Sequence, residues 1–352
     1  MGNWYVSREA IKNSAGISGS DLHSTIDAVI ESKSREVERH TRRIFIPKTQ
    51  TRLFRWPQRQ GIRSWQLDLD EDLQSVITLQ TKAQDSSPTT ISSSDYFTEP
   101  NNFGPPYDTI EIDLSSSASF ESGDSSQRTI SVAGSWGFSA DTRSTGTVAS
   151  GLDSDATATS FVCSNASLID VGDTLLIESE QVFVSERTAL DIGKNISDAS
   201  VTADLADVTI TMEASHGLLA GEVIRIDSEL MFIESVSTND LTVIRAYDGS
   251  TLAAHSNGAD VFHFRTLTIE RGANGTTGAT HADATAISKY EPPFDIRELI
   301  KAETISHIEQ DRSAWGRVVG AGENQRQVTA SGINRLRDMV VPYMKRLRSA
   351  AI

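Results

Sequence analysis

The chain has 352 residues, of which 38% are hydrophobic and 23% charged, a composition that can bury a core and that excludes a disordered chain. Its formal charge of −16 argues against a general nucleic-acid coat, because phosphate neutralisation needs clustered cations. No apolar run approaches the roughly 18–20 residues of a membrane span, and no signal peptide is expected. Cys163 is the only cysteine, so no intrachain disulfide is expected, and the composition predicts a soluble protein of a reducing compartment.

Two helices are predicted near the start of the chain. Ser7 is a suitable cap for a short helix that ends at Gly16, and Glu9 in its first turn favours the helix dipole. A longer helix begins after residues 18–21, has apolar residues at near-helical spacing and ends in a basic run at 35–43. This basic end has two interpretations: a solvated face that suits the dipole, or a docking surface for an acidic partner or for DNA phosphates.

Between residues 44 and 138 the hydrophobic period changes to two, which predicts half-buried strands. Five segments show this alternation: 51–56, 65–69, 75–79, 109–114 and 128–132. Turns rich in Pro, Gly and Ser join them, so this part is expected to form a small antiparallel layer beside the helices.

The helical period returns after Pro292-Pro293. Asp295 begins a predicted helix that ends at Trp315, and Ser331 caps a last helix in which Pro342 introduces a kink. The stretch from Ser331 onward is a short basic tail with several apolar residues.

The acidity is concentrated in one internal block, residues 151–290, which holds 21 Asp and Glu against 7 Lys and Arg. The two flanks are close to neutral and contain all five tryptophans. A change of composition this abrupt usually marks a domain boundary. The sequence therefore predicts a core split by an inserted, removable module.

The acidic block contains internal repeats. Residues 172–184 align with 221–233, and residues 241–255 align with 267–281 at seven identical positions. The order of the pieces is first half, first half, second half, second half, which indicates that one unit is inserted into a loop of another. Each half alternates apolar and polar residues, so each unit is predicted to be a small β barrel or sandwich.

These patterns define an α+β fold: a helical core with a small antiparallel β layer, plus two nested all-β inserted modules. The expected parts are residues 1–145 for the N-terminal part of the core, 151–199 for the first half of the outer module, 200–264 for the inner module, 265–290 for the second half of the outer module, and 291–352 for the C-terminal helices and tail.

Two histidines, His255 and His281, occupy equivalent repeat positions, which invites a metal-site interpretation. Neither has a cysteine or a second histidine at ligand spacing, so we expect each ring to cap a loop through hydrogen bonds. Six carboxylates of the repeats could in principle bind calcium, although they lack the Asp-x-Asp-x-Asp-Gly pattern that would make this specific. They are Asp173, Glu178, Glu180, Glu222, Asp227 and Glu229.

The sequence gives no positive sign of an enzyme. It contains no dinucleotide-binding glycine motif, no Walker loop and no Gly-x-Ser-x-Gly elbow, and Cys163 has no neighbouring base in the sequence. Two carboxylates of the acidic run 68–72 could pair for acid–base chemistry, but this run follows a strand into a turn, where carboxylates cap exposed amides. We therefore expect no catalytic residues, no cofactor and no metal.

With the acidic block set aside, residues 5–138 and 291–348 resemble the head–tail connector proteins of tailed bacteriophages, the adaptor or head-completion family that docks beneath the portal. The resemblance is carried by Tyr5-Val6-Ser7 before a short helix, by the helix at 22–43 that runs into Arg-Arg-Ile-Phe-Ile-Pro, and by residues 51–54, 67–76 and 128–138. In the family the last segment leads directly into Pro-Pro and a helix similar to 296–308, which places the insertion between Phe138 and Pro292. The nested repeats resemble small β modules of other phage virion proteins.

The resemblance implies a structural protein of the virion neck, assembled in the host cytoplasm and not associated with a membrane. It implies a homo-oligomeric ring, a dodecamer, that docks on the portal protein, extends the DNA channel without specific DNA binding, and carries a stopper or tail-completion protein. It also implies that the C-terminal tail docks on the portal, with the candidate residues Arg335, Arg337, Met339, Tyr343, Lys345, Arg346 and Arg348.

A basic tail on an acidic chain suits an acidic groove, and avidity in a ring multiplies such contacts. We expect this tail to be mobile in the free protein and ordered on docking. Two other classes remain open: another tail or baseplate structural protein, or an adhesin that binds a host-surface glycan through the β modules. The adhesin interpretation predicts an exposed aromatic patch, whereas residues 151–290 contain no Trp.

Overall fold

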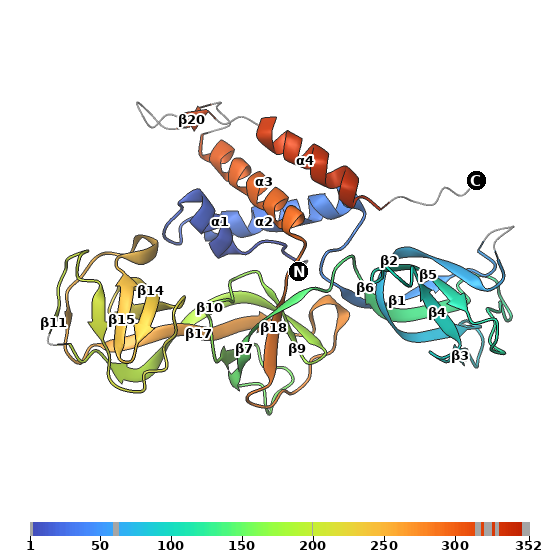
Figure 1. The fold of residues 1–352 in the computed structure, drawn as a ribbon, viewed down its shortest axis with the longest axis horizontal. Coiled ribbons are helices and arrows are strands. Elements are labelled where there is room, and N and C mark those ends of the chain that lie inside the picture. The colour runs from blue at the N-terminus through green and yellow to red at the C-terminus, as the bar shows by residue number, and fades with distance from the viewer. Residues whose placement is uncertain are drawn as a thin grey trace.

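The computed structural model of the chain describes residues 3–58, 63–198, 200–313, 318–319, 326–327 and 331–346. Figure 1 shows the helices α1 to α4 as a layer above a row of β bodies. The first β body follows the N-terminal helices in sequence, and the inserted block forms the other two. Within the described residues, no helix is both long enough and apolar enough to cross a membrane.

The helical layer contains α1 (Arg8–Ala15), α2 (His23–Thr41), α3 (Phe294–Arg312) and α4 (Ser331–Met344). The cap predicted for the first helix is present, because Ser7 Oγ accepts a hydrogen bond from the Ala10 amide at 3.3 Å. Gly16 ends this helix in the left-handed conformation at φ 62°, which glycine adopts without strain. The short strands β19 (Val318–Val319) and β20 (Arg326–Gln327) pair between α3 and α4.

Residues from both ends of the chain meet in one hydrophobic cluster of the helical layer. Tyr5, Val37 and Phe45 come from the N-terminal part of the chain. They pack with Ile300 of α3 and Val340 of α4, all of them buried. The segments on either side of the insertion therefore form one body.

The first β body is an antiparallel sheet of β1 (Lys48–Phe54), β2 (Gln66–Thr81), β3 (Thr89–Ile91), β4 (Tyr96–Glu99), β5 (Tyr107–Ile112) and β6 (Ile130–Trp136). The strand order is β1-β6-β2-β5-β4, with β3 paired to β2. The segments 65–69 and 75–79, predicted as two strands, are one strand. The buried Leu73 continues the apolar alternation between them, and bulges shift the register where β2 pairs with β5 and β6.

The inserted block forms one ten-stranded antiparallel sheet that is rolled into two barrels. Its strands are β7 (Thr142–Ser150), β8 (Ser160–Cys163), β9 (Thr174–Ile177), β10 (Glu180–Asn195), β12 (Thr209–Thr211), β13 (Val223–Ile226), β14 (Glu229–Ser237), β15 (Asp240–Ile244), β17 (Asp260–Glu270) and β18 (Ala286–Tyr290). The order is β10-β9-β18-β7-β8-β17-β13-β14-β15-β12, and β10 also pairs with β17. That extra pairing closes the first six strands into a ring, which we call the outer barrel.

The inner barrel uses the far halves of β10 and β17 together with β12 to β15. A bridge between Ile196 and Met212 brings the end of β10 beside the end of β12 and completes the circuit. The small pair β11 (Ser200–Val201) and β16 (His255–Ser256) and the 3-10 turn η1 (Tyr247–Gly249) lie in the same barrel, and η2 (Ala273–Gly275) is the equivalent turn of the outer one.

Each barrel has a hydrophobic cluster of its own. The outer cluster combines residues from before and after the inner sequence, such as Phe161 and Leu267, whereas the inner cluster contains Ile224 and Ile233. The outer barrel begins with β7 at Thr142, earlier than the boundary expected at residue 151.

The prediction of a helical core is wrong. The chain is 37% strand and 20% helix, and no helical connector core is present in the described residues. The helices pack mainly on one another, α2 with α3 and α3 with α4, while strands supply most of the regular structure. The two hydrophobic clusters of the helices also include residues outside them, among them Phe45, Ile46 and Phe183.

The helical layer packs directly on the outer barrel. The Trp4 ring lies edge-on to Phe183 of β10 with centroids 5.3 Å apart, and both side chains are buried. Val171 and Phe183 join Ile11 and Ile26 in one cluster. The barrel thus supports α1 and α2, and removal of the insertion would expose side chains of this cluster.

Candidate functional site

The C-terminal helix α4 carries most of the residues expected to dock on a partner. Arg335, Met339 and Tyr343 are spaced four residues apart, so they follow one face of the helix. All three are exposed, with Met339 at 57% and Tyr343 at 80% of their full accessibility. The opposite face is anchored, because Val340 and Met344 are buried in the helical cluster. We call Arg335, Met339 and Tyr343 the α4 stripe.

Two other expected docking residues are already occupied within the chain. Arg337 lies 2.7 Å from Glu303 of α3 and 3.3 Å from Glu36 of α2. Arg346 forms an ion pair with Asp72 of β2, donates to the Leu69 carbonyl at 3.1 Å, and its amide donates to Thr41 O at 2.8 Å.

Asp72 connects the end of α4 to the first sheet. Its carboxylate also lies 3.1 Å from Arg43. Burial raises the pKa of this carboxyl, and the charges of Arg346 and Arg43 only partly offset that effect.

The tail was expected to be mobile, but its residues 331–346 pack against the rest of the chain. Its apolar residues divide into an inner pair, Val340 and Met344, and an outer pair, Met339 and Tyr343. Lys345 is exposed, whereas Arg348 lies outside the described residues.

The repeats build the same buried ion cluster in both barrels. In the inner barrel Arg245 lies against Glu229, with Nε 2.8 Å from Oε1 and Nη2 2.9 Å from Oε2. His255 places Nε2 2.9 Å from Glu229 Oε2 and Nδ1 2.7 Å from Asp227. Backbone amides of Ala246 and Ala253 also donate to Glu229, at 2.8 and 3.0 Å.

The outer barrel repeats these contacts at the aligned positions. Arg271 Nε lies 2.7 Å from Glu180 Oε1 and its Nη2 lies 2.6 Å from Oε2. His281 lies 2.9 Å from both Glu180 and Glu178. Each cluster links a strand to the loop that follows the arginine shared by the two copies of the repeat. Its contacts therefore hold that loop against the strand.

The carboxylates considered as calcium ligands are engaged in the same way. Asp173 pairs with Lys289 at 3.2 Å, and Glu222 receives Arg265 in a two-pronged contact at 2.7 Å. Among the described residues, no group of three or more His, Cys, Asp or Glu side chains is arranged to hold a metal ion.

Acid should weaken both barrels through these clusters. Burial alone would raise the pKa of Glu180 and of Glu229, but the hydrogen bonds from the arginine, the backbone amides and the histidine lower each pKa from 4.5 to about 2. Because the folded pKa lies below the unfolded one, the stabilisation is present above about pH 4.5 and is lost as the pH falls toward 2. We expect urea midpoints to fall steeply in that window.

The matched variant for this test is the double substitution Glu180→Gln and Glu229→Gln. It should be less stable at neutral pH and should show a shallower decline between pH 4.5 and 2. Equal pH slopes in the two proteins would show that other carboxyls control acid unfolding.

The acidic run 68–72 lies within β2 and not in a turn, and its Asp70 and Glu71 contact Arg52 of β1, at 2.9 and 3.1 Å. Cys163 is buried in the outer barrel, and burial raises the pKa of its thiol to about 11, which disfavours a nucleophilic thiolate.

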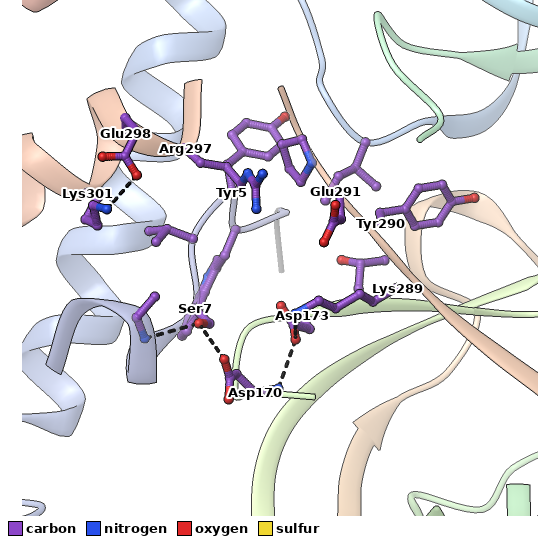
Figure 2. A pocket seen from close by; sticks show the side chains of 16 residues that line it. Tyr5, Ser7, Asp170, Asp173, Lys289, Tyr290, Glu291, Arg297, Glu298 and Lys301 are labelled. Atoms are coloured by element: carbon purple, nitrogen blue, oxygen red, sulfur yellow. Dashed lines mark hydrogen bonds and ion pairs between the residues drawn. The ribbon is translucent and has the colours of Figure 1, made fainter. Parts of the chain in front are cut away.

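A cavity of about 260 Å³ lies where the N-terminal segment, the outer barrel and α3 meet (Figure 2). Ser7 Oγ donates to Asp170 at 3.0 Å, and the Asp170 amide donates to Asp173 at 2.9 Å. Burial raises the pKa of Asp173 to about 6, the Lys289 charge opposes this, and the Asp170 charge adds to it. Arg297 and Lys301 reach the cavity from the α3 side. The cavity lies between the helical layer and the outer barrel, and both polar and apolar side chains line it.

Sequence reasoning missed the residues that join the barrels to the helical layer. Lys12 of α1 forms an ion pair with Asp248 of η1 at 2.6 Å, and Asn274 of η2 donates to Asn3 at 2.7 Å. Asp248 and Asn274 are aligned in the repeat, so each barrel presents the same loop to the N-terminal region. That equivalence was visible in the alignment, but the partners lie more than 200 residues away.

Comparisons of the chain with protein-family models, with curated proteins and with solved structures find no match.

Proposed function

We propose that this chain is a structural protein of the neck of a tailed-phage virion, a ring adaptor that docks on the portal, extends the DNA channel and carries the next tail component. One support is the resemblance of residues 5–138 and 291–348 to that family. A second is that these two segments share one hydrophobic cluster. The two ends of the inserted block lie side by side, since Thr142 pairs with Tyr290 and the Glu291 amide donates to Asp141 O at 2.8 Å.

The observation that carries the docking part of the proposal is the α4 stripe. An isolated terminal helix would bury its apolar residues wherever it could, yet α4 is held by Arg337 and Arg346 with Met339 and Tyr343 facing outward. A fixed helix with an exposed aromatic and a thioether is pre-organised for a groove, so little ordering entropy opposes binding.

Charge complementarity points to an acidic groove on the portal side. Arg335 belongs to the α4 stripe and Lys345 follows it, both exposed, and Arg39 and Arg42 are exposed near the end of α2. Nearly all of the net negative charge belongs to the inserted block, so this end is where an acidic partner meets attraction instead of repulsion.

The test replaces the stripe and leaves the anchor intact. The triple variant Arg335→Glu, Met339→Ser and Tyr343→Ser should remain folded with an unchanged melting temperature, because surface substitutions usually change stability by about 0.5 kcal/mol or less. It should lose co-sedimentation with purified portal rings, and negative-stain images should show portals without an added ring.

A matched control is Phe103→Ser, which removes a side chain that is 86% exposed in the loop between β4 and β5. This control should bind portals like the wild type. Normal attachment of the triple variant would contradict the docking role of α4, and filaments or isolated monomers at all concentrations would contradict a ring.

A further inference from the structure

His23, the first residue of α2, lies between two buried cations. Its Nε2 is 3.0 Å from Lys12 Nζ, and its Nδ1 is 3.4 Å from Arg8 Nη1. Lys12 and Arg8 are both on α1 and both are buried. A neutral imidazole can accept a hydrogen bond through one nitrogen, whereas a doubly protonated ring turns an N–H toward both cations.

Each of these cations anchors a different barrel. Lys12 pairs with Asp248 of the inner barrel at 2.6 Å, and the Gly19 amide donates to the same carboxylate at 3.1 Å. Arg8 Nη1 lies 3.5 Å from Glu186 of β10, where the outer barrel continues toward the inner one.

The Arg8 anchor has two further contacts. Its guanidinium donates to both oxygens of Asp27 on α2, at 2.8 and 2.6 Å. Its backbone amide donates to Val171 O of the outer barrel at 3.0 Å. Lys12 and Arg8 thus connect the helical layer to both inserted barrels, and the His23 side chain contacts both of these anchors.

We propose that His23 is a proton-sensitive latch: protonation of its ring places a third positive charge between Lys12 and Arg8 and loosens the attachment of the barrels to the helical layer. The charged groups that face the ring are Lys12 and Arg8 from α1, Asp27 from α2, Glu186 from β10 and Asp248 from η1. The three carboxylates are each paired with one of the two cations, so the added charge competes with existing pairs.

The direction of the effect follows from the environment of the ring. Burial, followed by the charges of Lys12 and Arg8, lowers the pKa of His23 below its ordinary value of 6.5. The state in which the barrels are attached to the helical layer therefore prefers the neutral ring, and this attachment weakens as the pH falls below about 6.5. Glu9 on α1 titrates in the opposite sense: burial and the Asp170 charge raise its pKa to about 7, so its protonation relieves repulsion at the outer barrel.

The experiment measures the distance between the helical layer and the inner barrel in the full chain. Spin labels are attached at Ser32→Cys on α2 and Ser228→Cys on the inner barrel, both exposed positions, while Cys163 is buried and stays unlabelled. At pH 7.5 we expect one narrow distance distribution. At pH 5.5 we expect a several-fold larger fraction of a second, broader population.

Two variants assign the response to the ring. His23→Gln keeps an acceptor for Lys12 without the charge, and it should retain the narrow distribution at both pH values. His40→Gln on the same helix, where the native ring is 54% exposed, should respond like the wild type. An unchanged wild-type distribution at pH 5.5, or an equal response in His23→Gln, would overturn the proposal.

A further variant tests the anchor without altering the ring. Asp248→Asn should show the broad population already at pH 7.5, because the Lys12 pair is lost, and circular dichroism should show that the barrels remain folded. A narrow distribution in this variant at pH 7.5 would overturn the anchoring role of Lys12. This latch does not depend on the proposed virion function, since it concerns contacts within one chain.

Discussion

Replacement of Arg245 by methionine is expected to unfold the inner barrel selectively. The substitution preserves the volume of the side chain but leaves the buried Glu229 carboxylate without its cation, and it removes the donors to Thr202 O, Asp207 O and Ala253 O. Breaking a buried ion pair by removing one partner typically costs about 3–5 kcal/mol. A loss of this size is comparable to the stability of a small domain, so the inner barrel should melt at ambient temperature.

Hydrogen exchange followed by mass spectrometry would localise the effect. Peptides of β13 to β15 should exchange fast, whereas the first sheet should keep its protection. The matched control is Arg225→Met in the same barrel, where the native guanidinium stacks over Phe262 at 4.2 Å on a partly exposed surface and should matter far less. Equal protection in Arg245→Met and Arg225→Met would refute the structural role of the ion cluster.

The substitution Trp4→Ala should separate the helical layer from the outer barrel. The indole fills the space between Phe183 and the backbone of Gly172, and truncating a buried tryptophan typically costs about 3–5 kcal/mol. We expect a fall in melting temperature and faster exchange in α1 and at residues 169–173. The barrel cores need not unfold, because Leu175 and Leu267 belong to a cluster that does not include Trp4.

Phe103→Ala is the control for this second substitution, since an exposed aromatic contributes little to folding. If the Trp4 variant kept the wild-type melting temperature and exchange pattern, the helical layer would not depend on the barrel for its stability. That result would support the prediction that the insertion can be removed without unfolding the rest of the chain.

Local patterns were predictable wherever neighbouring residues in the chain determine the structure. The caps at Ser7 and Gly16 and the strand alternation follow from residues close together in the chain, and the repeat positions follow from aligning the two copies. The structural interpretation of His255 and His281 also came from the sequence, because neither has a cysteine or a second histidine at ligand spacing. Glu180 and Glu229, by contrast, were considered only as calcium ligands, because their ion pairs with Arg271 and Arg245 were not predicted.

The balance of helix and strand was not predictable by the same means. Helical periodicity shows which face of a helix is apolar, but it does not show whether that face meets another helix or a barrel. The packing of α4 was missed for a related reason: Arg346 and Asp72 are 274 positions apart, and nothing in the local sequence links them. A tail that is mobile in the free protein was expected, whereas the chain itself supplies the surface on which Val340 and Met344 are buried.

The continuous strands β10 and β17 determine how the inserted block can grow. In the outer barrel they pair with the same register and the same bulge as β14 and β15 of the inner barrel, Phe183 opposite Glu270 and Phe232 opposite Ile244. In the inner copy the pair closes at the turn formed by residues 238–239, whereas in the outer copy it runs on into the next barrel. Inserting a further copy of the repeat at that turn would add one barrel to the inserted block, and a two-stranded ribbon would connect each added barrel to the one before it. The length of the inserted block would then increase by one barrel at a time.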